Sequence, residues 1–415
     1  MWTRVIRGPL FRPHERFLRI AYSPDHMNCM GDRGRSRPIL GLLLCLVMSS
    51  AGVRAAEQAE AHQAGEVAPS IEADIVNTAL EHCRLGEAIQ AQALFNAIKA
   101  QLELTDPMRE IIRSLEASGC AGVAAPPPVR WSVQLGGGYD NNVNQGILSR
   151  SLVMGSGLSS IELELGDAYR PKASAFVVGG LDASFRIGNF AVGQVAVQHR
   201  DNHSVPELNM TSLVASAISP FSLFDRPGRI QFDLGETWLG GSNYQKAGSA
   251  GVQWLFMGSG QPWLASLATL RTNYASLPNQ DNQLTELGIW REKHVAPTLG
   301  FFGGLSALYD RAVNRRPGGD RAGWRFQLGG TTVMADWLIQ PRLNVLRWES
   351  QELFSPGLID VRRRHQLAIL DIQLVRPIAE KQQIILEWRA SSAQDSVPLF
   401  TYRAQSVGVY WRLQR

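Results

Sequence analysis

Four residues in one short stretch of the chain carry side chains that enzymes and metal sites use. His199, Asp201, His203 and Ser204 bring together two imidazole rings, a carboxylate and a hydroxyl. An imidazole can serve as a general base and a serine hydroxyl as a nucleophile, whereas His and Asp together can ligate a metal. Residues this close in sequence more often form a polar turn, and the sequence offers no second cluster with an orienting group or an oxyanion donor. We therefore predict a polar turn here, without catalysis or a bound metal.

The rest of the sequence adds no catalytic or cofactor motif. His294 and His365 are isolated and are expected to be packing or rim residues. The sequence contains no zinc-ligand spacing, phosphate-binding loop or nucleophile elbow. It therefore predicts a protein that is not an enzyme and needs no cofactor.

A second polar stretch, Gly-Gly-Gly-Tyr-Asp-Asn-Asn-Val-Asn-Gln, covers residues 136–145. Its Asp and Asn side chains could ligate Ca²⁺, but their spacing lacks the ligand set of an EF-type loop. Glycines can allow tight strand packing or leave room in a lumen, and Asp and Asn can complete the hydrogen bonds where a strand ends. We expect this structural role for Gly136, Gly138, Asp140, Asn141, Asn142 and Asn144.

The alternation of apolar with small or polar residues predicts the β-strands that position these residues. From Trp131 to Arg415, apolar residues alternate with small or polar ones over short segments that end in Gly, Pro, Asn or Asp. This pattern is typical of strands with one face toward lipid and the other toward a lumen. We predict a 14-stranded antiparallel transmembrane β-barrel over residues 130–415, preceded by a small α-helical periplasmic module. The expected strands are 130–141, 173–187, 189–202, 208–219, 229–239, 242–257, 261–274, 281–293, 295–309, 321–334, 336–349, 362–376, 381–393 and 400–414.

An even strand count returns both ends of the barrel to the periplasm, so alternate connections are periplasmic turns. The tight turn at 335–336 fits the periplasmic side. Two connections fit poorly, because 219–228 is long for a periplasmic turn and 240–241 is tight for an outer loop. The expected long outer loops are 142–172, 310–320 and 350–361.

The same alternation predicts which residues face the lumen. In the last strand, Val407, Val409 and Trp411 keep the alternation to the end, as expected of the strand that the barrel-assembly machinery recognises. A soluble periplasmic β-sandwich or propeller would also alternate, but the eleven Trp, many at strand ends, favour the aromatic girdles of a membrane barrel. The candidate lumen-lining residues are Gln134, Asp233, Arg342, Glu387 and Arg389.

Residues 1–55 predict an export signal with a start codon assigned too far upstream. Basic residues precede an apolar run from Ile39 to Met48, and Val53-Arg54-Ala55 resembles a cleavage site. The run is too short to span a bilayer comfortably, which favours cleavage over a retained anchor, and initiation is expected at Met27 or Met30. Without these residues, 32 basic and 34 acidic residues remain, a net charge of about −2. The mature chain therefore predicts no nucleic-acid partner.

The segment before the barrel divides into three parts. Residues 56–70 are expected to be a disordered lead-in, 71–120 a helical module with a loosely tetratricopeptide-like Leu-Gly-Glu-Ala junction, and 121–129 a Pro-rich linker. Cys83 and Cys120 belong to the module. An oxidising periplasm would permit one disulfide between them, and two separate small apolar residues are the alternative.

The stretch Gly-x-Gly-Tyr-Asp-Asn-Asn-Val-Asn at 136–144 resembles the start of the barrel domain in the surface lipoprotein assembly modifier (Slam) family. The residues that carry the resemblance are Gly136, Gly138, Tyr139, Asp140, Asn141, Asn142 and Asn144. Members join periplasmic tetratricopeptide helices to a fourteen-stranded outer-membrane barrel and are implicated in delivering lipoproteins, and in some cases soluble proteins, to the cell surface. The helical region of this chain is much shorter than the usual array of the family. The resemblance implies an outer-membrane location and a role in surface delivery.

Our leading hypothesis is an outer-membrane barrel that helps translocate or assemble a surface lipoprotein or a secreted client protein. Its expected partners are outer-membrane lipids, the client and the barrel-assembly machinery. Lumenal polar residues would line the client's route, and client strands could pair at the barrel's seam. Loop 142–172 contains Leu152-Val153-Met154 and would either plug the lumen or pack as an outer loop. The alternative function is a solute porin or an exopolysaccharide-export channel.

Overall fold

A computed structural model of the chain describes residues 106–117, 129–155, 160–188, 191–223, 226–256, 263–296 and 299–415, with short helical stretches at 79–80, 95–96 and 98–99. The predicted signal peptide and lead-in, Cys83 and Cys120 lie outside these residues. The helix α4 (Asp106–Ala117) is described, and its Ile112 is buried. The helical module as a whole stays a prediction.

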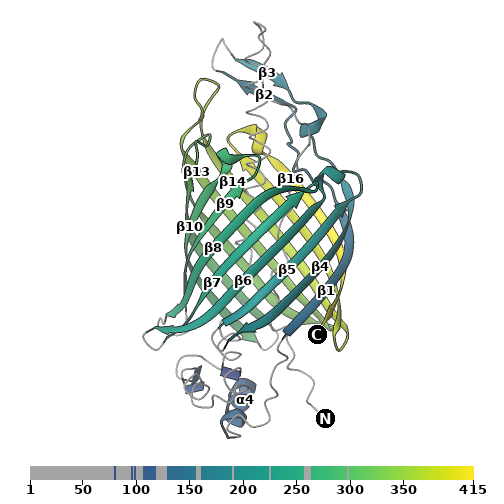
Figure 1. Ribbon diagram of the computed structural model, residues 1–415, viewed down its shortest axis with the longest axis vertical. Coiled ribbons are helices and arrows are strands. Elements are labelled where there is room, and N and C mark those ends of the chain that lie inside the picture. Colours follow the sequence, from purple (N-terminus) through teal and green to yellow (C-terminus); the bar gives the residue numbers. More distant parts are fainter. Residues whose placement is uncertain are drawn as a thin grey trace.

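Fourteen antiparallel strands form one closed barrel in which each strand pairs with its neighbours in sequence and β1 pairs with β16 (Figure 1). This arrangement confirms the predicted fold class. The barrel strands are β1 (Val129–Asp140), β4 (Ser174–Ile187), β5 (Ala191–Asn202), β6 (Met210–Leu223), β7 (Arg226–Leu239), β8 (Ser242–Phe256), β9 (Trp263–Tyr274), β10 (Asn282–Ala296), β11 (Leu299–Ala312), β12 (Arg321–Met334), β13 (Trp337–Ser355), β14 (Ile359–Ala379), β15 (Gln382–Asp395) and β16 (Tyr402–Gln414).

The two ends of the barrel differ in their connections. At the end where β1 begins and β16 finishes, hereafter the turn end, strands are joined by tight turns such as Ala335-Asp336, whose φ angles are 47° and 65°. The opposite end, hereafter the loop end, carries the longer connections and the 3-10 turns η3 (Pro206–Leu208), η4 (Pro278–Gln280) and η5 (Pro398–Phe400). Both barrel termini therefore lie at the turn end, as an even strand count requires.

The strand boundaries correct two expected connections. The expected long turn at 219–228 is short, because β6 and β7 stay paired as far as Leu223 and Arg226. The expected outer loop at 350–361 is largely strand, since β13 and β14 continue beyond their predicted ends. Leu353 pairs with Arg362, and Ser355 pairs with Ile359. The turn Gly240-Gly241 is tight as expected, and both of its residues have positive φ angles, 54° and 82°, that glycine adopts without strain.

The loop between β1 and β4 contains a second sheet that the sequence did not predict. Strands β2 (Ser151–Met154) and β3 (Ile161–Glu164) pair with each other and stand beyond the loop end of the barrel (Figure 1). One face of this sheet is buried through Leu152 and Met154. These side chains pack with the end of β13 and with the connection between β15 and β16 in an apolar cluster made of Ile147, Leu152, Met154, Leu165, Phe354, Val397, Leu399 and Phe400.

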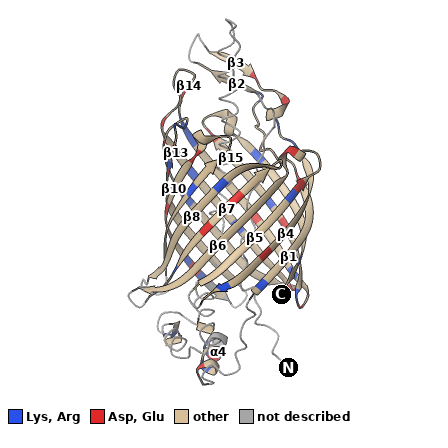
Figure 2. Ribbon diagram, in the orientation of Figure 1, with Lys and Arg blue, Asp and Glu red and all other residues tan. Residues whose placement is uncertain are grey.

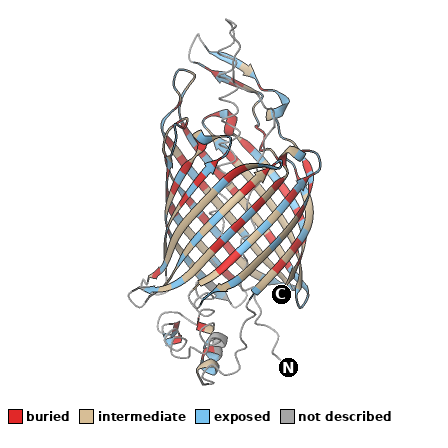
Figure 3. Cartoon of the chain, viewed as in Figure 1, coloured by how far each residue is buried: buried red, intermediate tan, exposed pale blue. Residues whose placement is uncertain are grey.

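The barrel wall has an apolar outward face and a more polar inward face. In β7, Phe232 and Leu234 are 56% and 68% exposed, whereas the alternate residue Thr237 is buried. Exposed and less exposed residues also alternate along much of β4, β12 and β16, and charged residues are scattered over the strands (Figures 2 and 3). Exposed apolar side chains around a closed barrel are the arrangement of outer-membrane barrels. Among the helices that the structure describes, none is long and apolar enough to cross a bilayer.

A charge on the outward face should destabilise the barrel. Leu234→Arg would place a guanidinium in the lipid, and we expect it to lower the free energy of unfolding by about 2–4 kcal/mol. The measurement is urea-dependent folding into phosphatidylcholine vesicles. Gln231→Arg is the matched control, because Gln231 shares the inward face of the same strand with Asp233, to which it donates a hydrogen bond of 2.9 Å. Equal losses in the two variants would contradict the assignment of faces.

Candidate functional site at the junction of the first and last strands

The motif at the end of β1 forms a buried polar network. Asp140 and Asn142 are 1% and 2% exposed. The Asn142 amide donates to Asp140 Oδ1 at 3.0 Å, and Asn142 Nδ2 donates to the carbonyls of Gly146 at 3.0 Å and Arg403 at 2.8 Å. Gly146 N donates to Asn142 Oδ1 at 2.6 Å. Asn142 therefore joins the start of the β1–β4 loop to the last strand.

Two further motif residues extend the network in opposite directions. Asn141 bonds the last strand twice, because its amide donates to the Gln405 carbonyl at 3.0 Å and its Oδ1 accepts from the Gln405 amide at 2.8 Å. Asn144 bonds the returning end of the loop, since its Oδ1 accepts from the Lys172 amide at 2.8 Å and its Nδ2 donates to the Arg170 carbonyl at 2.7 Å. We call Asp140, Asn141, Asn142 and Asn144 the clasp.

The clasp also reaches β5 through an ion pair. Arg200 Nη2 lies 3.3 Å from Asp140 Oδ2, and both side chains are almost fully buried. The Arg200 guanidinium also lies 3.8 Å from the centre of the Phe176 ring on β4. Because Asp140 is on β1, Phe176 on β4 and Arg200 on β5, these contacts join three strands. Removing one partner of the buried pair would leave an uncompensated charge.

The glycines of the motif make room for aromatic rings on the inward face. A Cβ on Gly138 would lie 2.6 Å from Phe176 Cζ, and one on Gly408 would lie 2.5 Å from Tyr410 Oη. Gly136 would likewise meet the Tyr410 ring. The Phe176 and Tyr410 rings therefore lie against glycines of the neighbouring strand β1, and Tyr410 also lies against Gly408 of its own strand. Tyr139, the aromatic residue of the motif itself, is exposed on the outward face.

The junction of β1 and β16 is fully paired. Every residue from Ser132 to Asp140 has a register partner between Gln414 and Ser406. Gln134 is buried on the inward face, and its Oε1 accepts from Arg412 Nη2 at 2.6 Å and from Nε at 3.2 Å. At the turn end, Trp131 and Arg415 exchange two backbone hydrogen bonds of 3.0 and 2.9 Å. The barrel is closed here by both backbone and side-chain bonds.

The other candidate lumenal residues lie on inward faces within networks of polar contacts. Asp233 on β7 accepts from Ser249 Oγ at 2.6 Å. On β15, Glu387 accepts from Gln373 Nε2 at 3.1 Å, and Arg389 Nε lies 3.6 Å from Asp371 Oδ1. Arg342 on β13 stands in register opposite Asp371. Three of the candidates, Arg342, Glu387 and Arg389, therefore come together on β13 and β15 beside Asp371 and Gln373 of β14.

The residues considered for catalysis at the end of β5 do not converge. His199 and Asp201 are exposed on the outward face of the strand, and His203 follows it. His199 Nδ1 lies 2.9 Å from Thr211 Oγ1, whereas Asp201 Oδ1 accepts from Asn209 Nδ2 at 2.5 Å. The two side chains are thus bound to different residues, Thr211 of β6 and Asn209 just before that strand. Within the described part of the chain, no three His, Cys, Asp or Glu side chains are grouped to hold a metal.

A buried cluster at the loop end was missed by the sequence reasoning. His365, expected to be isolated, has its Nδ1 2.9 Å from Asp395 Oδ2, and Arg363 Nε donates to the same oxygen at 2.7 Å. The His365 ring stacks on Trp348 at 5.0 Å, and the Arg363 guanidinium lies 3.4 Å from the Phe400 ring centre. Asp395 Oδ1 in turn accepts from the Val397 amide at 2.8 Å, which fixes η5 to the wall.

No family model matches the chain, and no curated protein sequence matches it. Similar solved structures include the Acinetobacter baumannii outer membrane protein Omp33 (7% identity, 70% of this chain and 100% of that chain, TM-score 0.33), a bacterial polysaccharide outer membrane secretin (10%, 69% and 97%, 0.36) and CdiB from Acinetobacter baumannii (9%, 70% and 61%, 0.38).

Loss of the central clasp residue should loosen the junction. Asn142→Ala leaves buried carbonyls and an amide without their partner, and we expect it to lower the free energy of unfolding by about 1–3 kcal/mol. Asn273→Ala is the control, because the Asn273 side chain is exposed and accepts one hydrogen bond, from Arg271. It should lower the free energy of unfolding by at most about 0.5 kcal/mol. Urea titration of both variants in vesicles measures the difference, and equal costs would contradict the role of the clasp.

The packing of aromatic rings against glycine can be tested at a glycine where the atoms nearest to an added Cβ all belong to one aromatic side chain. On β11, a Cβ on Gly304 would meet three atoms of the Trp290 ring, whereas the nearest atoms to one on Gly303 are 3.7 Å away. We expect Gly304→Val to cost about 1–3 kcal/mol and Gly303→Val to cost much less. Trp290→Ala should remove most of the penalty of Gly304→Val in a double-mutant cycle of unfolding free energies. An unchanged penalty would show that the ring does not set it.

Proposed function

We propose that the chain is an outer-membrane barrel of the Slam type that helps translocate or assemble a surface lipoprotein or a secreted client protein. The observation that carries the proposal is the clasp. The stretch that resembles the family is the one that binds β1 to β16 and anchors both ends of the loop bearing β2 and β3. This loop would thereby be held at the cell surface, where a delivered client has to fold.

The small sheet offers a place for a client strand. Within the described residues, β2 pairs only with β3. On the outer edge of β2, the Ser151 carbonyl accepts from Ser149 Oγ at 2.6 Å and the adjoining Gly155 amide donates to the Leu358 carbonyl at 2.8 Å. Another strand would therefore pair with the backbone of Val153 or with the outer edge of β3. Val153 and Ile161 are 59% and 55% exposed on this sheet. A client emerging unfolded would add a strand here and complete its fold outside the cell. In this proposal the barrel contributes no chemistry, the turn end faces the periplasm, and the barrel-assembly machinery inserts it.

The proposal is tested by the surface exposure of a co-expressed lipoprotein client on intact cells. We expect protease to cleave the client only when the barrel is present. Val153→Pro removes a backbone donor and blocks strand addition, so it should lower cleavage to the level of the deletion strain. Arg315→Pro, in the exposed loop between β11 and β12, is the matched control and should leave cleavage unchanged. If every client stayed equally exposed after deletion of the barrel, the proposal would be wrong.

A solute porin or exopolysaccharide-export channel is the second candidate, and the paired charges of the inward face favour it. Arg325 Nη1 lies 2.5 Å from Glu286 Oε2, and Arg389 and Asp371 form a similar cross-strand pair. Opposite charges along a wall suit the passage of hydrated solutes. A channel predicts stepwise open conductance of purified protein in planar bilayers, and a silent barrel would count against it.

A further inference from the structure

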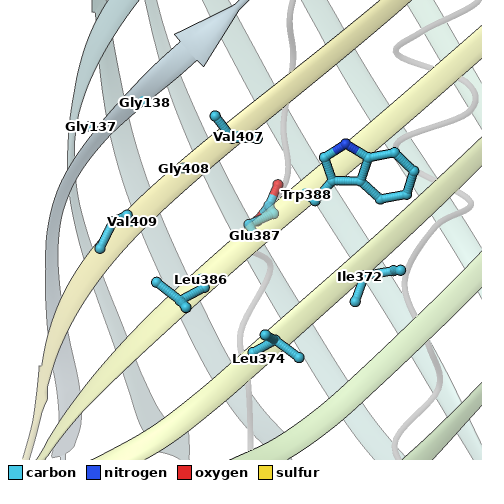
Figure 4. Close-up of a pocket in the computed structure, with 10 residues that line it drawn as sticks. All are labelled: Gly137, Gly138, Ile372, Leu374, Leu386, Glu387, Trp388, Val407, Gly408 and Val409. Carbon is cyan, nitrogen blue, oxygen red and sulfur yellow. The ribbon is translucent and has the colours of Figure 1, made fainter.

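A recess lies in the outward face of the wall beside the β1–β16 junction. It has a volume of about 300 Å³ and is formed by four neighbouring strands, β1, β16, β15 and β14 (Figure 4). Its outward side chains are all apolar: Ile372, Leu374, Leu386, Trp388, Val407 and Val409. The recess therefore lies in the surface that the membrane covers.

The recess exists because a row of outward side chains is interrupted. Gly137 stands in register between Val409 of β16 and Val177 of β4 and contributes no side chain. Backbone of Gly137 and its neighbours forms part of the lining, and Trp388 stands at one side (Figure 4). Glu387 also borders the recess, but its carboxylate is bound by Gln373 on the inward face. The space is thus a concave, apolar site of the kind that accepts a flexible hydrocarbon chain.

A cation stands beside the recess on the same face. Arg376 follows Leu374 by two residues along β14, about 7 Å toward the turn end at the usual rise of a strand. Arg376 is exposed, and its guanidinium lies 5.7 Å from the ring centre of Trp337, the first residue of β13. A Trp with a cation at the end of a membrane strand marks the level of lipid headgroups. Lys381, in the next turn, adds a second exposed cation beside Glu380.

We propose that this recess binds one acyl chain of a phospholipid from the leaflet at the turn end, with the headgroup phosphate against Arg376. Along β14, Arg376 lies nearer the turn end than the apolar recess does. A phospholipid of that leaflet has the same order, with its phosphate at the membrane surface and its acyl chain deeper in the bilayer. The site adds to the proposed function and does not depend on it, because it requires only that the barrel lie in a membrane.

The chain offers a matched control for ordinary contact with surrounding lipid. Arg291 on β10 is also exposed and lies 5.2 Å from the ring centre of Trp263, the first residue of β9. It repeats the pair of cation and indole at the turn end but stands on strands that do not form the recess. A bound phospholipid should depend on Arg376 and not on Arg291.

The experiment uses the full chain in phosphatidylcholine vesicles that contain a small fraction of phosphatidylglycerol with a photoreactive diazirine on one acyl chain. After illumination, adducts are located by mass spectrometry of peptides. We expect them on the peptides that carry Leu386, Trp388 and Val407. Arg376→Glu should lower their yield about fivefold or more, as expected for loss of one basic side chain near a headgroup. Val407→Trp, which fills the recess, should lower the yield without changing the headgroup contact.

Folding of each variant is checked by its heat-modifiable electrophoretic mobility, and Val409→Trp provides a second filled recess. Four results would overturn the proposal. They are adducts spread evenly over β5 to β7, equal losses for Arg291→Glu and Arg376→Glu, equal labelling by a diacylglycerol with the same diazirine chain but no phosphate, and displacement of the probe by lipopolysaccharide but not by unlabelled phosphatidylglycerol. The last result would assign the recess to a lipid of the opposite leaflet.

Discussion

The structure depends on the requirement that backbone hydrogen bonds be completed within the wall. In a bilayer core no water can pair with the N–H and C=O groups of an open edge, and each unpaired group costs several kcal/mol. A sheet with an apolar outward face therefore has to close, and here β1 closes on β16. The clasp continues this pairing past the end of the strands, where Asn141 and Asn142 bond backbone groups of Gln405 and Arg403.

Closure also explains why the two faces of the barrel wall differ in polarity. Each strand presents alternate residues to the lipid and to the enclosed side, so the outward face has to be apolar while the inward face can hold charges. Those charges are paired across strands, as Arg200 of β5 with Asp140 of β1 and Arg363 of β14 with Asp395 of β15. Where glycine interrupts the wall, rings such as Tyr410 cover it from within, and at Gly137 the gap is left on the lipid side.

Alternation in the sequence predicted the closed antiparallel barrel and its number of strands, because a period of two is a local property. It also predicted that Asp140 and the asparagines complete hydrogen bonds at a strand end. Their partners could not be predicted, since Arg403 and Gln405 lie more than 250 residues away and meet the motif only through closure. The contact of His365 with Asp395 was missed for the same reason, because it depends on the register of β14 against β15. The sheet of β2 and β3 was missed because its strands have only four residues each.

The register of β1 against β16 is the most direct test of this account. Tyr139 and Val407 are register partners, and both are about half exposed on the outward face. Cysteines at these two positions should be joined efficiently by a short thiol crosslinker in the membrane-inserted protein, and those at Tyr139 and Trp411, which are out of register, should not. Efficient joining of the second pair, or of neither pair, would contradict closure through these strands.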